Sequence, residues 1–113
     1  MVILVVEDDR LLNLVASDDL ERSGYEVISA FDADQAIDIL ESRDDIRLLF
    51  TDIDMPGSMD GLKLMAAVRD RWPPIPIIVT SGKHAPCELP ERTSFVPKPY
   101  RAEHVLQTIA ALV

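Results

Sequence analysis

The sequence is poor in the features that mark secreted, membrane and nucleic-acid-binding proteins. Its 113 residues include one cysteine, Cys87, so no internal disulfide can form and nothing indicates an oxidising compartment. No apolar run approaches the roughly 18 residues that span a bilayer. The short N-terminal run has no basic flank and does not resemble a signal peptide. A net charge of −9 disfavours a nucleic-acid surface. We therefore expect a cytoplasmic protein that contacts neither membrane nor nucleic acid.

Aromatic residues are also scarce, at 5% of the sequence, although hydrophobic residues make up 48%. Such a composition predicts a core of valine, isoleucine, leucine and alanine, which is typical of parallel α/β packing. The length suits one domain over residues 1–113 with a single buried core.

Short apolar runs rich in β-branched residues alternate with helical patterns along the chain. The runs predict strands at residues 2–6, 25–31, 46–50, 75–79 and 93–96. Between and after them, apolar residues recur at helical spacing and predict four helices, carried by Leu12, Val15, Ala16, Leu20; Ala33, Ala36, Ile37, Leu40; Leu64, Met65, Val68, Trp72; and Ala102, Val105, Leu106, Ile109, Leu112. Right-handed crossovers then give an α/β fold with a doubly wound five-stranded parallel sheet.

Polar residues follow four of the predicted strands at the point where each strand ends. They are Glu7, Asp8 and Asp9 after the first strand, Asp52 after the third, Thr80 and Ser81 after the fourth, and Lys98 after the fifth. The carboxyl ends of parallel strands share one edge of a sheet. With the flavodoxin-like order 2-1-3-4-5, the switch point falls between the first and third strands, and Asp8 lies beside Asp52.

Crowded carboxylates repel one another and raise their own pKa values unless a cation is present. Oxygen ligands suit a hard ion, and Mg²⁺ favours one or two carboxylates with waters and a phosphate oxygen. A carboxylate can also attack phosphorus and form an aspartyl phosphate. The remaining needs are charge neutralisation and positioning of the phosphoryl oxygens, which the Thr80 hydroxyl and the Lys98 ammonium can supply. The pattern therefore indicates that Asp52 accepts a phosphoryl group.

These motifs resemble the receiver domain of two-component response regulators, in order and in spacing, over the whole chain. They are Val5-Val6-Glu7-Asp8-Asp9, Thr51-Asp52-Ile53-Asp54-Met55-Pro56, Met59-Asp60-Gly61, Thr80-Ser81 and Lys98-Pro99-Tyr100. The resemblance implies that Asp52 is the phosphorylated aspartate, that Glu7 and Asp8 are the acidic pair, and that Asp8 and the backbone carbonyl of Asp54 bind Mg²⁺ directly.

The same resemblance implies a switch. Thr80 matches the switch hydroxyl, Lys98 the lysine that pairs with the phosphoryl oxygens, and Phe95 a rotating aromatic, with Tyr100 as a second candidate switch residue. The bond between Lys98 and Pro99 is a candidate cis peptide. A sensor histidine kinase or a histidine phosphotransfer protein would be the phosphodonor, and a homodimer could form on phosphorylation. The domain would not be an enzyme beyond its own phosphorylation and dephosphorylation.

Two segments depart from the family pattern. Residues 56–60 contain one residue more than the common spacing, which lengthens the loop beside the site. Only about a dozen residues, 82–93, separate the fourth and fifth strands, and prolines stand at positions 86 and 90. A βαβ crossover needs roughly 10–12 residues including its helix. We therefore expect the fourth helix of the family to be shortened or missing, which puts the usual fourth-helix dimer surface in doubt.

Other functions remain open on the sequence alone. Asp52-Ile53-Asp54 resembles the Asp-x-Asp of haloacid-dehalogenase phosphatases, but it follows the third strand and not the first. A phosphorylation-independent interaction module is a second alternative, and a flavodoxin-type FMN protein a weaker third, because acids replace a phosphate-binding loop. His84 and His104 are expected at the surface. Whether the chain stands alone or belongs to a larger regulator or hybrid kinase is left open.

Overall fold

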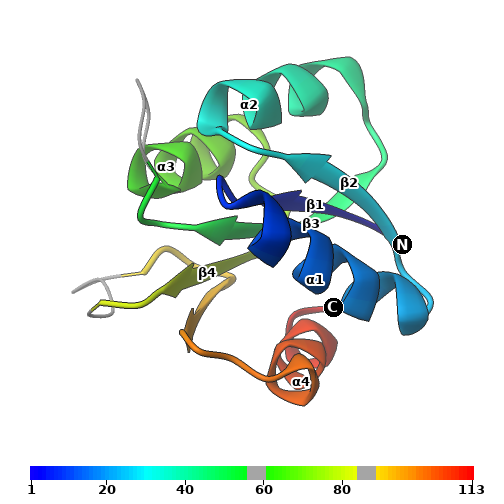
Figure 1. Ribbon diagram of the computed structural model, residues 1–113. Coiled ribbons are helices and arrows are strands. Elements are labelled where there is room, and N and C mark those ends of the chain that lie inside the picture. Colours follow the sequence, from blue (N-terminus) through cyan, green and yellow to red (C-terminus); the bar gives the residue numbers. More distant parts are fainter. Residues whose placement is uncertain (56–60, 84–88) are drawn as a thin grey trace.

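The structure, a computed structural model, describes residues 1–55, 61–83 and 89–113. Five strands form one parallel sheet in the order β2-β1-β3-β4-β5, which confirms the predicted fold class and strand order (Figure 1). The strand bounds are β1 Val2–Val6, β2 Glu26–Ala30, β3 Ile46–Asp52, β4 Ile77–Ser81 and β5 Thr93–Pro97.

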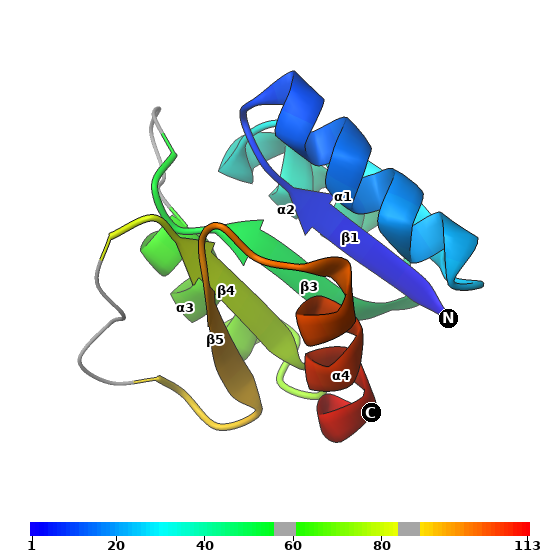
Figure 2. The same cartoon turned by 60° about the horizontal axis from the view of Figure 1, so that its bottom comes forward.

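Four helices in the described residues cover the two faces of the sheet. They are α1 Arg10–Arg22, α2 Ala33–Ser42, α3 Gly61–Arg71 and α4 Ala102–Leu112. The helices α2 and α3 lie on one face, and α1 and α4 lie on the other (Figures 1 and 2). Each face has its own core because side chains of a strand alternate between the two sides. The doubly wound arrangement is therefore the one that the alternation of patterns predicted.

The third and fourth strands end later than the apolar runs suggested. The strand β3 continues through Asp52, whose partner in the register is Thr80 of β4. The strand β4 begins at Ile77 and ends at Ser81, so the predicted range 75–79 was wrong by two residues. The backbone explains the shift, because the N–H of Ile53 donates to the carbonyl of Thr80 at 2.9 Å and keeps the polar residues in the ladder.

The ends of α1 and α2 are capped by residue types that favour these positions. Asp9 and Asp32 are the N-caps of α1 and α2, and the Asp32 carboxylate accepts from the N–H of Gln35 at 2.7 Å. The Gln35 side chain in turn accepts from the N–H of Phe31 at 2.9 Å. Gly24 follows α1 with a φ of 97°, a conformation that glycine adopts without steric cost. Asp60, whose place before the third helical pattern makes it a candidate N-cap, lies outside the described residues.

The helix α1 buries only part of the stripe that its apolar spacing suggested, namely Leu20, which lies in the core, and Ala16, which packs against it. Leu12 and Val15 are 42% and 51% exposed, whereas the residues that α1 buries are Asn13, Ser17 and Leu20. The helix is therefore rotated so that two polar side chains face the sheet. The two buried polar residues have hydrogen-bond partners there, which removes the desolvation cost that would otherwise oppose this rotation.

The connection between β4 and β5 contains no helix in its described residues, 82–83 and 89–92. The guanidinium of Arg69 on α3 closes this side of the sheet by donating to the carbonyls of Pro73 at 2.6 Å and Ile75 at 3.0 Å. It also reaches the carbonyl of Arg92 and the hydroxyl of Thr93. The lengthened loop, His84 and Cys87 lie in ranges 56–60 and 84–88, outside the described residues.

Candidate functional site

The register of the sheet brings the predicted polar residues to one edge. Thr51 pairs with Val6 and Asp52 with Thr80, while Ser81 pairs with Pro97. The residues that follow β1 therefore lie beside the end of β3, and Lys98, which follows β5, reaches Asp52 across the end of β4. The structure thus gathers side chains that stand more than ninety positions apart in the chain, since Glu7 and Lys98 are separated by 91 residues.

Lys98 occupies the centre of this site. Its Nζ atom donates to Asp52 Oδ2 at 2.8 Å and to Glu7 Oε1 at 2.9 Å. The Asp52 and Glu7 side chains are only 4% and 7% exposed, and that of Lys98 is 22% exposed. Burial alone would lower the pKa of Lys98, but the hydrogen bonds to Asp52 and Glu7 outweigh it and raise that pKa. The lysine is therefore firmly held in its charged form.

Three carboxylates at this edge fit a hard divalent cation. Oxygens of Glu7, Asp8 and Asp52 lie within 4.8 Å of one another, with Asp8 exposed and the other two buried. Burial raises the pKa of Glu7, although the hydrogen bond from Lys98 opposes this shift. One ammonium does not neutralise three carboxylates. An all-oxygen donor set that carries surplus negative charge is the kind of set that Mg²⁺ prefers.

Asp54 contributes to the site through its backbone. Its N–H donates to Asp52 Oδ1 at 2.9 Å. Each oxygen of the Asp52 carboxylate therefore accepts one hydrogen bond, Oδ1 from Asp54 and Oδ2 from Lys98. The Asp54 carboxylate instead accepts from the hydroxyl of Ser81 at 2.5 Å. Ser81 was noted in the sequence only as a neighbour of Thr80, and nothing in its spacing indicated this contact.

Thr80 has a buried polar atom that is not used within the site. Its hydroxyl is buried and has no hydrogen-bond partner among the described residues. A buried hydroxyl without a partner is costly. This group is therefore available to a ligand oxygen at the end of β4.

The two candidate switch aromatics lie on opposite faces of the sheet. Phe95 is partly buried against the core beneath α2 and α3. Tyr100 packs on the other face, where its ring meets that of Phe50 edge-on with centroids 5.5 Å apart. The bond between Lys98 and Pro99 is cis, as predicted.

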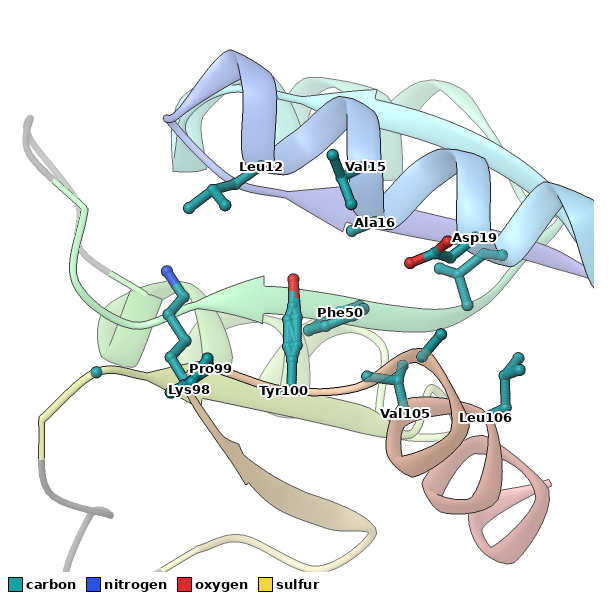
Figure 3. A pocket seen from close by; sticks show the side chains of 13 residues that line it. Leu12, Val15, Ala16, Asp19, Phe50, Lys98, Pro99, Tyr100, Val105 and Leu106 are labelled. Carbon is teal, nitrogen blue, oxygen red and sulfur yellow. The ribbon is translucent and has the colours of Figure 1, made fainter.

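A groove of about 540 Å³ opens between α1 and α4 beside the site. Figure 3 shows Lys98 and Tyr100 rising from one wall toward α1, with Leu12, Val15 and Asp19 on the opposite wall. The groove is mostly apolar, and it reaches the same lysine that contacts Asp52. A partner seated in it would therefore lie next to the acidic cluster.

Two residues that shape the site were missed from the sequence. Gly61 opens α3 so close to the end of β3 that a Cβ atom there would meet the backbone of Asp52 and Ile53. Its place after Met59-Asp60 in the motif was the available signal. Asn13 fixes the carbonyl of Glu7, and no signal marked it, because a polar residue in a helix is ordinarily expected at the surface.

A five-stranded α/β fold with an acidic cluster at the carboxyl edge defines the class of protein. The sequence profile of the response regulator receiver domain matches residues 3–110, and the chain belongs to this family. It is a receiver domain, a signalling module and not an enzyme, with the Glu7, Asp8 and Asp52 cluster that is typical of a phosphoacceptor site. The haloacid-dehalogenase alternative is thereby set aside.

Relatives agree with this assignment. The chain is 32% identical to the response regulator protein FleR of Pseudomonas aeruginosa over 113 residues, which cover 96% of this chain and 24% of FleR. It is 31% identical to the transcriptional regulatory protein CpxR of Escherichia coli over 115 residues, 98% of this chain and 48% of CpxR. The chain thus spans less than half the length of either relative.

Solved structures agree on the fold. The receiver domain of the hybrid histidine kinase CckA is 31% identical, with a TM-score of 0.86 over 99% of this chain and 98% of that one. TrrA of Thermotoga maritima, at 24% identity, has the same fold, with a TM-score of 0.89 over 99% of this chain and 98% of that one. Among the described residues, no helix combines the length and apolarity needed to cross a membrane.

Proposed function

We propose that this domain, over residues 1–113, accepts a phosphoryl group on Asp52. The observation that carries the proposal is the contact between Lys98 Nζ and Asp52 Oδ2, within an acidic cluster at the end of a buried strand. An oxygen of the Asp52 carboxylate would attack phosphorus. The new O–P bond would form as the N–P bond of a phosphohistidine breaks, and the released imidazole nitrogen would keep the bonding electrons and take up a proton from water.

The carboxylates of Glu7, Asp8 and Asp52 and the backbone carbonyl of Asp54 would hold Mg²⁺. The bound ion would supply the positive charge that the phosphoryl oxygens require. Two observations support this set of ligands. The three carboxylates lie together. The Asp54 side chain accepts a hydrogen bond from the Ser81 hydroxyl, so we expect it not to be a metal ligand. The TrrA structure was determined in complex with Mg²⁺ and a beryllium fluoride.

Phosphorylation would add about two negative charges at Asp52. The unpartnered hydroxyl of Thr80 and the ammonium of Lys98 are the donors within the site that could bond the new oxygens. A shift of Thr80 would displace Val96, its partner in β5, and with it the adjacent Phe95. We place the switch at Thr80 and Phe95, with Tyr100, which packs on the opposite face, as the second candidate switch residue.

The test is labelling by a small phosphodonor such as acetyl phosphate, in the presence of Mg²⁺. The wild type and Asp54→Asn should both take the label, because Asp54 acts through its backbone, whereas Asp52→Asn should take none. A label that persists in Asp52→Asn would assign the acceptor elsewhere. A wild type that folds but takes no label would support the phosphorylation-independent interaction module.

The groove between α1 and α4 is the surface we propose for the phosphodonor, a histidine kinase or histidine phosphotransfer domain. Leu12 and Val15, at 42% and 51% exposed, form part of its apolar wall on α1. Val15→Asp should slow transfer from a phosphohistidine domain while leaving labelling by acetyl phosphate intact. Leu62→Asp, on α3 and also exposed, is the matched control and should transfer at the wild-type rate. Equal rates in both variants would remove the groove from the donor surface.

A further inference from the structure

A chain of buried polar contacts runs from α1 to the acidic cluster. Asn13 is 1% exposed, and its side-chain amide donates to the carbonyl of Glu7 at 3.2 Å and to that of Ala30 at 3.0 Å. Its own carbonyl accepts from the hydroxyl of Ser17 at 3.1 Å, and Ser17 contacts the hydroxyl of Ser29 at 3.2 Å. The amide thus joins the ends of β1 and β2 beneath the first turn of α1.

The orientation of α1 shows that these contacts are specific. The helix leaves Leu12 and Val15 about half exposed, at 42% and 51%, and buries Asn13 and Ser17 against the sheet. The amide of Asn13 points at two strand carbonyls and not at its own helix, so it acts on the segment that leads into the acidic pair.

Glu7 is consequently held at each of its polar groups. Its N–H donates to the carbonyl of Ala30 at 3.1 Å, and its carbonyl accepts from Asn13. Its carboxylate accepts from Lys98 and from the N–H of Asp9 at 3.1 Å. Asp8 lies between two residues, Glu7 and Asp9, that are fixed in this way. The position of the exposed Asp8 carboxylate therefore depends on the hydrogen bonds that its neighbours Glu7 and Asp9 make.

We infer that Asn13 is a positioning residue for the metal site: through the carbonyl of Glu7 it fixes the turn that presents Glu7 and Asp8. This inference rests on the proposed function, since it concerns the affinity of the same site for Mg²⁺. Groups that orient metal ligands from behind typically contribute 10-fold to 100-fold to metal affinity. Without the amide, the Glu7 carbonyl would lose its side-chain partner, and the turn could sample positions in which Asp8 is misdirected.

The experiment is an NMR titration of the folded protein with Mg²⁺, which yields a dissociation constant from folded resonances alone. Asn13→Ala should bind Mg²⁺ about 10-fold more weakly than the wild type. Asn13→Asp has nearly the same shape but no donor when ionised and should bind more weakly still. Ser29→Ala alters the far end of the same chain of contacts without touching Asn13, and should keep the wild-type affinity.

Each outcome decides the matter. Affinities of Asn13→Ala and Asn13→Asp within twofold of the wild type would overturn the inference while leaving the proposed function intact. Absence of folded resonances in both variants would overturn it as well and make Asn13 a purely structural residue. A folded wild type that binds no Mg²⁺ would overturn the metal site itself, and that result is seen before any variant is made.

Discussion

The N–H of Gly61 donates to the carbonyl of Ile53 at 3.1 Å, and this bond holds the first turn of α3 against the end of β3. The approach is so close that a Cβ atom on residue 61 would overlap the carbonyl of Asp52 and lie 2.5 Å from the Cα of Ile53. Both obstacles are backbone atoms, which cannot move aside as a flexible side chain can.

Gly61→Ala should lower the free energy of unfolding by about 2 kcal/mol or more, the scale of overpacking in a tight site. Alanine ordinarily favours a helix over glycine, so the sign of the effect is itself informative. Gly82→Ala is the control, because nothing lies within 4 Å of a Cβ at that position. Urea unfolding measures the free energy of unfolding of both variants. A value for Gly61→Ala equal to that of the wild type would contradict the close approach of residue 61 to the end of β3.

Lys98→Met should destabilise the protein at neutral pH in the absence of Mg²⁺. The substitution leaves the buried carboxylates of Asp52 and Glu7 side by side without a cation, and breaking a largely buried pair costs roughly 3 kcal/mol. Arg22→Met breaks an exposed pair with Asp18, at 78% and 52% exposure, and should cost less than about 1 kcal/mol. Equal losses in urea unfolding would show that the Lys98 contacts contribute no more than a surface pair.

Mg²⁺ should raise the melting temperature, because a ligand that binds only the folded state stabilises it. The gain should approach about 2.7 kcal/mol at a hundred times the dissociation constant. Asp8→Asn should lose most of this gain, since it removes a ligand of the cluster. Asp44→Asn changes an exposed acid in the α2–β3 turn and should show the same Mg²⁺-dependent gain as the wild type. Thermal unfolding in Mg²⁺ and in a chelator compares the three proteins; an equal gain in Asp8→Asn would remove Asp8 from the ligand set.

Arg69→Met should lower the free energy of unfolding by about 2 kcal/mol. The substitution leaves the carbonyls of Pro73 and Ile75 without their donor on the side of the sheet where the β4–β5 connection is short. Arg71→Met, on the same helix, removes an exposed pair with Glu41 and should cost less than about 1 kcal/mol. If urea unfolding gives the same loss of unfolding free energy for both variants, the hydrogen bonds of Arg69 to Pro73 and Ile75 contribute no more than a surface ion pair.

Tyr100 should ionise at a higher pH than an ordinary tyrosine, because burial raises the pKa of its hydroxyl. The unfolded chain would then lose this proton first, so stability should fall as the pH rises through the ordinary value of about 10. The ultraviolet absorbance of tyrosinate measures the ionisation. Tyr100→Phe removes this hydroxyl, so the difference between the wild-type and variant curves gives the ionisation of Tyr100 alone. A difference curve centred at the ordinary pKa of tyrosine would contradict the shift.

Much of the fold could be predicted because each strand is a short apolar run and each crossover is a separate helical pattern. The site could be predicted because Glu7, Asp52 and Lys98 all stand at strand ends, where a parallel sheet brings them to one edge. The features that were not predicted depend on backbone atoms, whose positions cannot be read from the pattern of residue types. The rotation of α1 is set by the backbone carbonyls of Glu7 and Ala30, and a backbone carbonyl is present at every residue whatever its type.

The strand ends escaped for a similar reason. Thr80 and Ser81 were taken as residues after a strand because they are polar, yet their backbones continue the ladder of β4. A strand is defined by backbone pairing, and polarity marks only where one face of it meets a site. Arg69 was likewise unmarked, because the carbonyls that it bonds lie after α3 and beside β5 and are brought together only in the folded sheet.

The separation of 91 residues between Glu7 and Lys98 has a consequence for the protein during its synthesis. A ribosome must extend the chain through Lys98 before the cation that faces Asp52 exists at all. A nascent or truncated chain that stops short of β5 carries the aspartate but not its counter-ion. Such a chain would have a carboxylate at the end of β3 without the ammonium that faces it in the complete sheet.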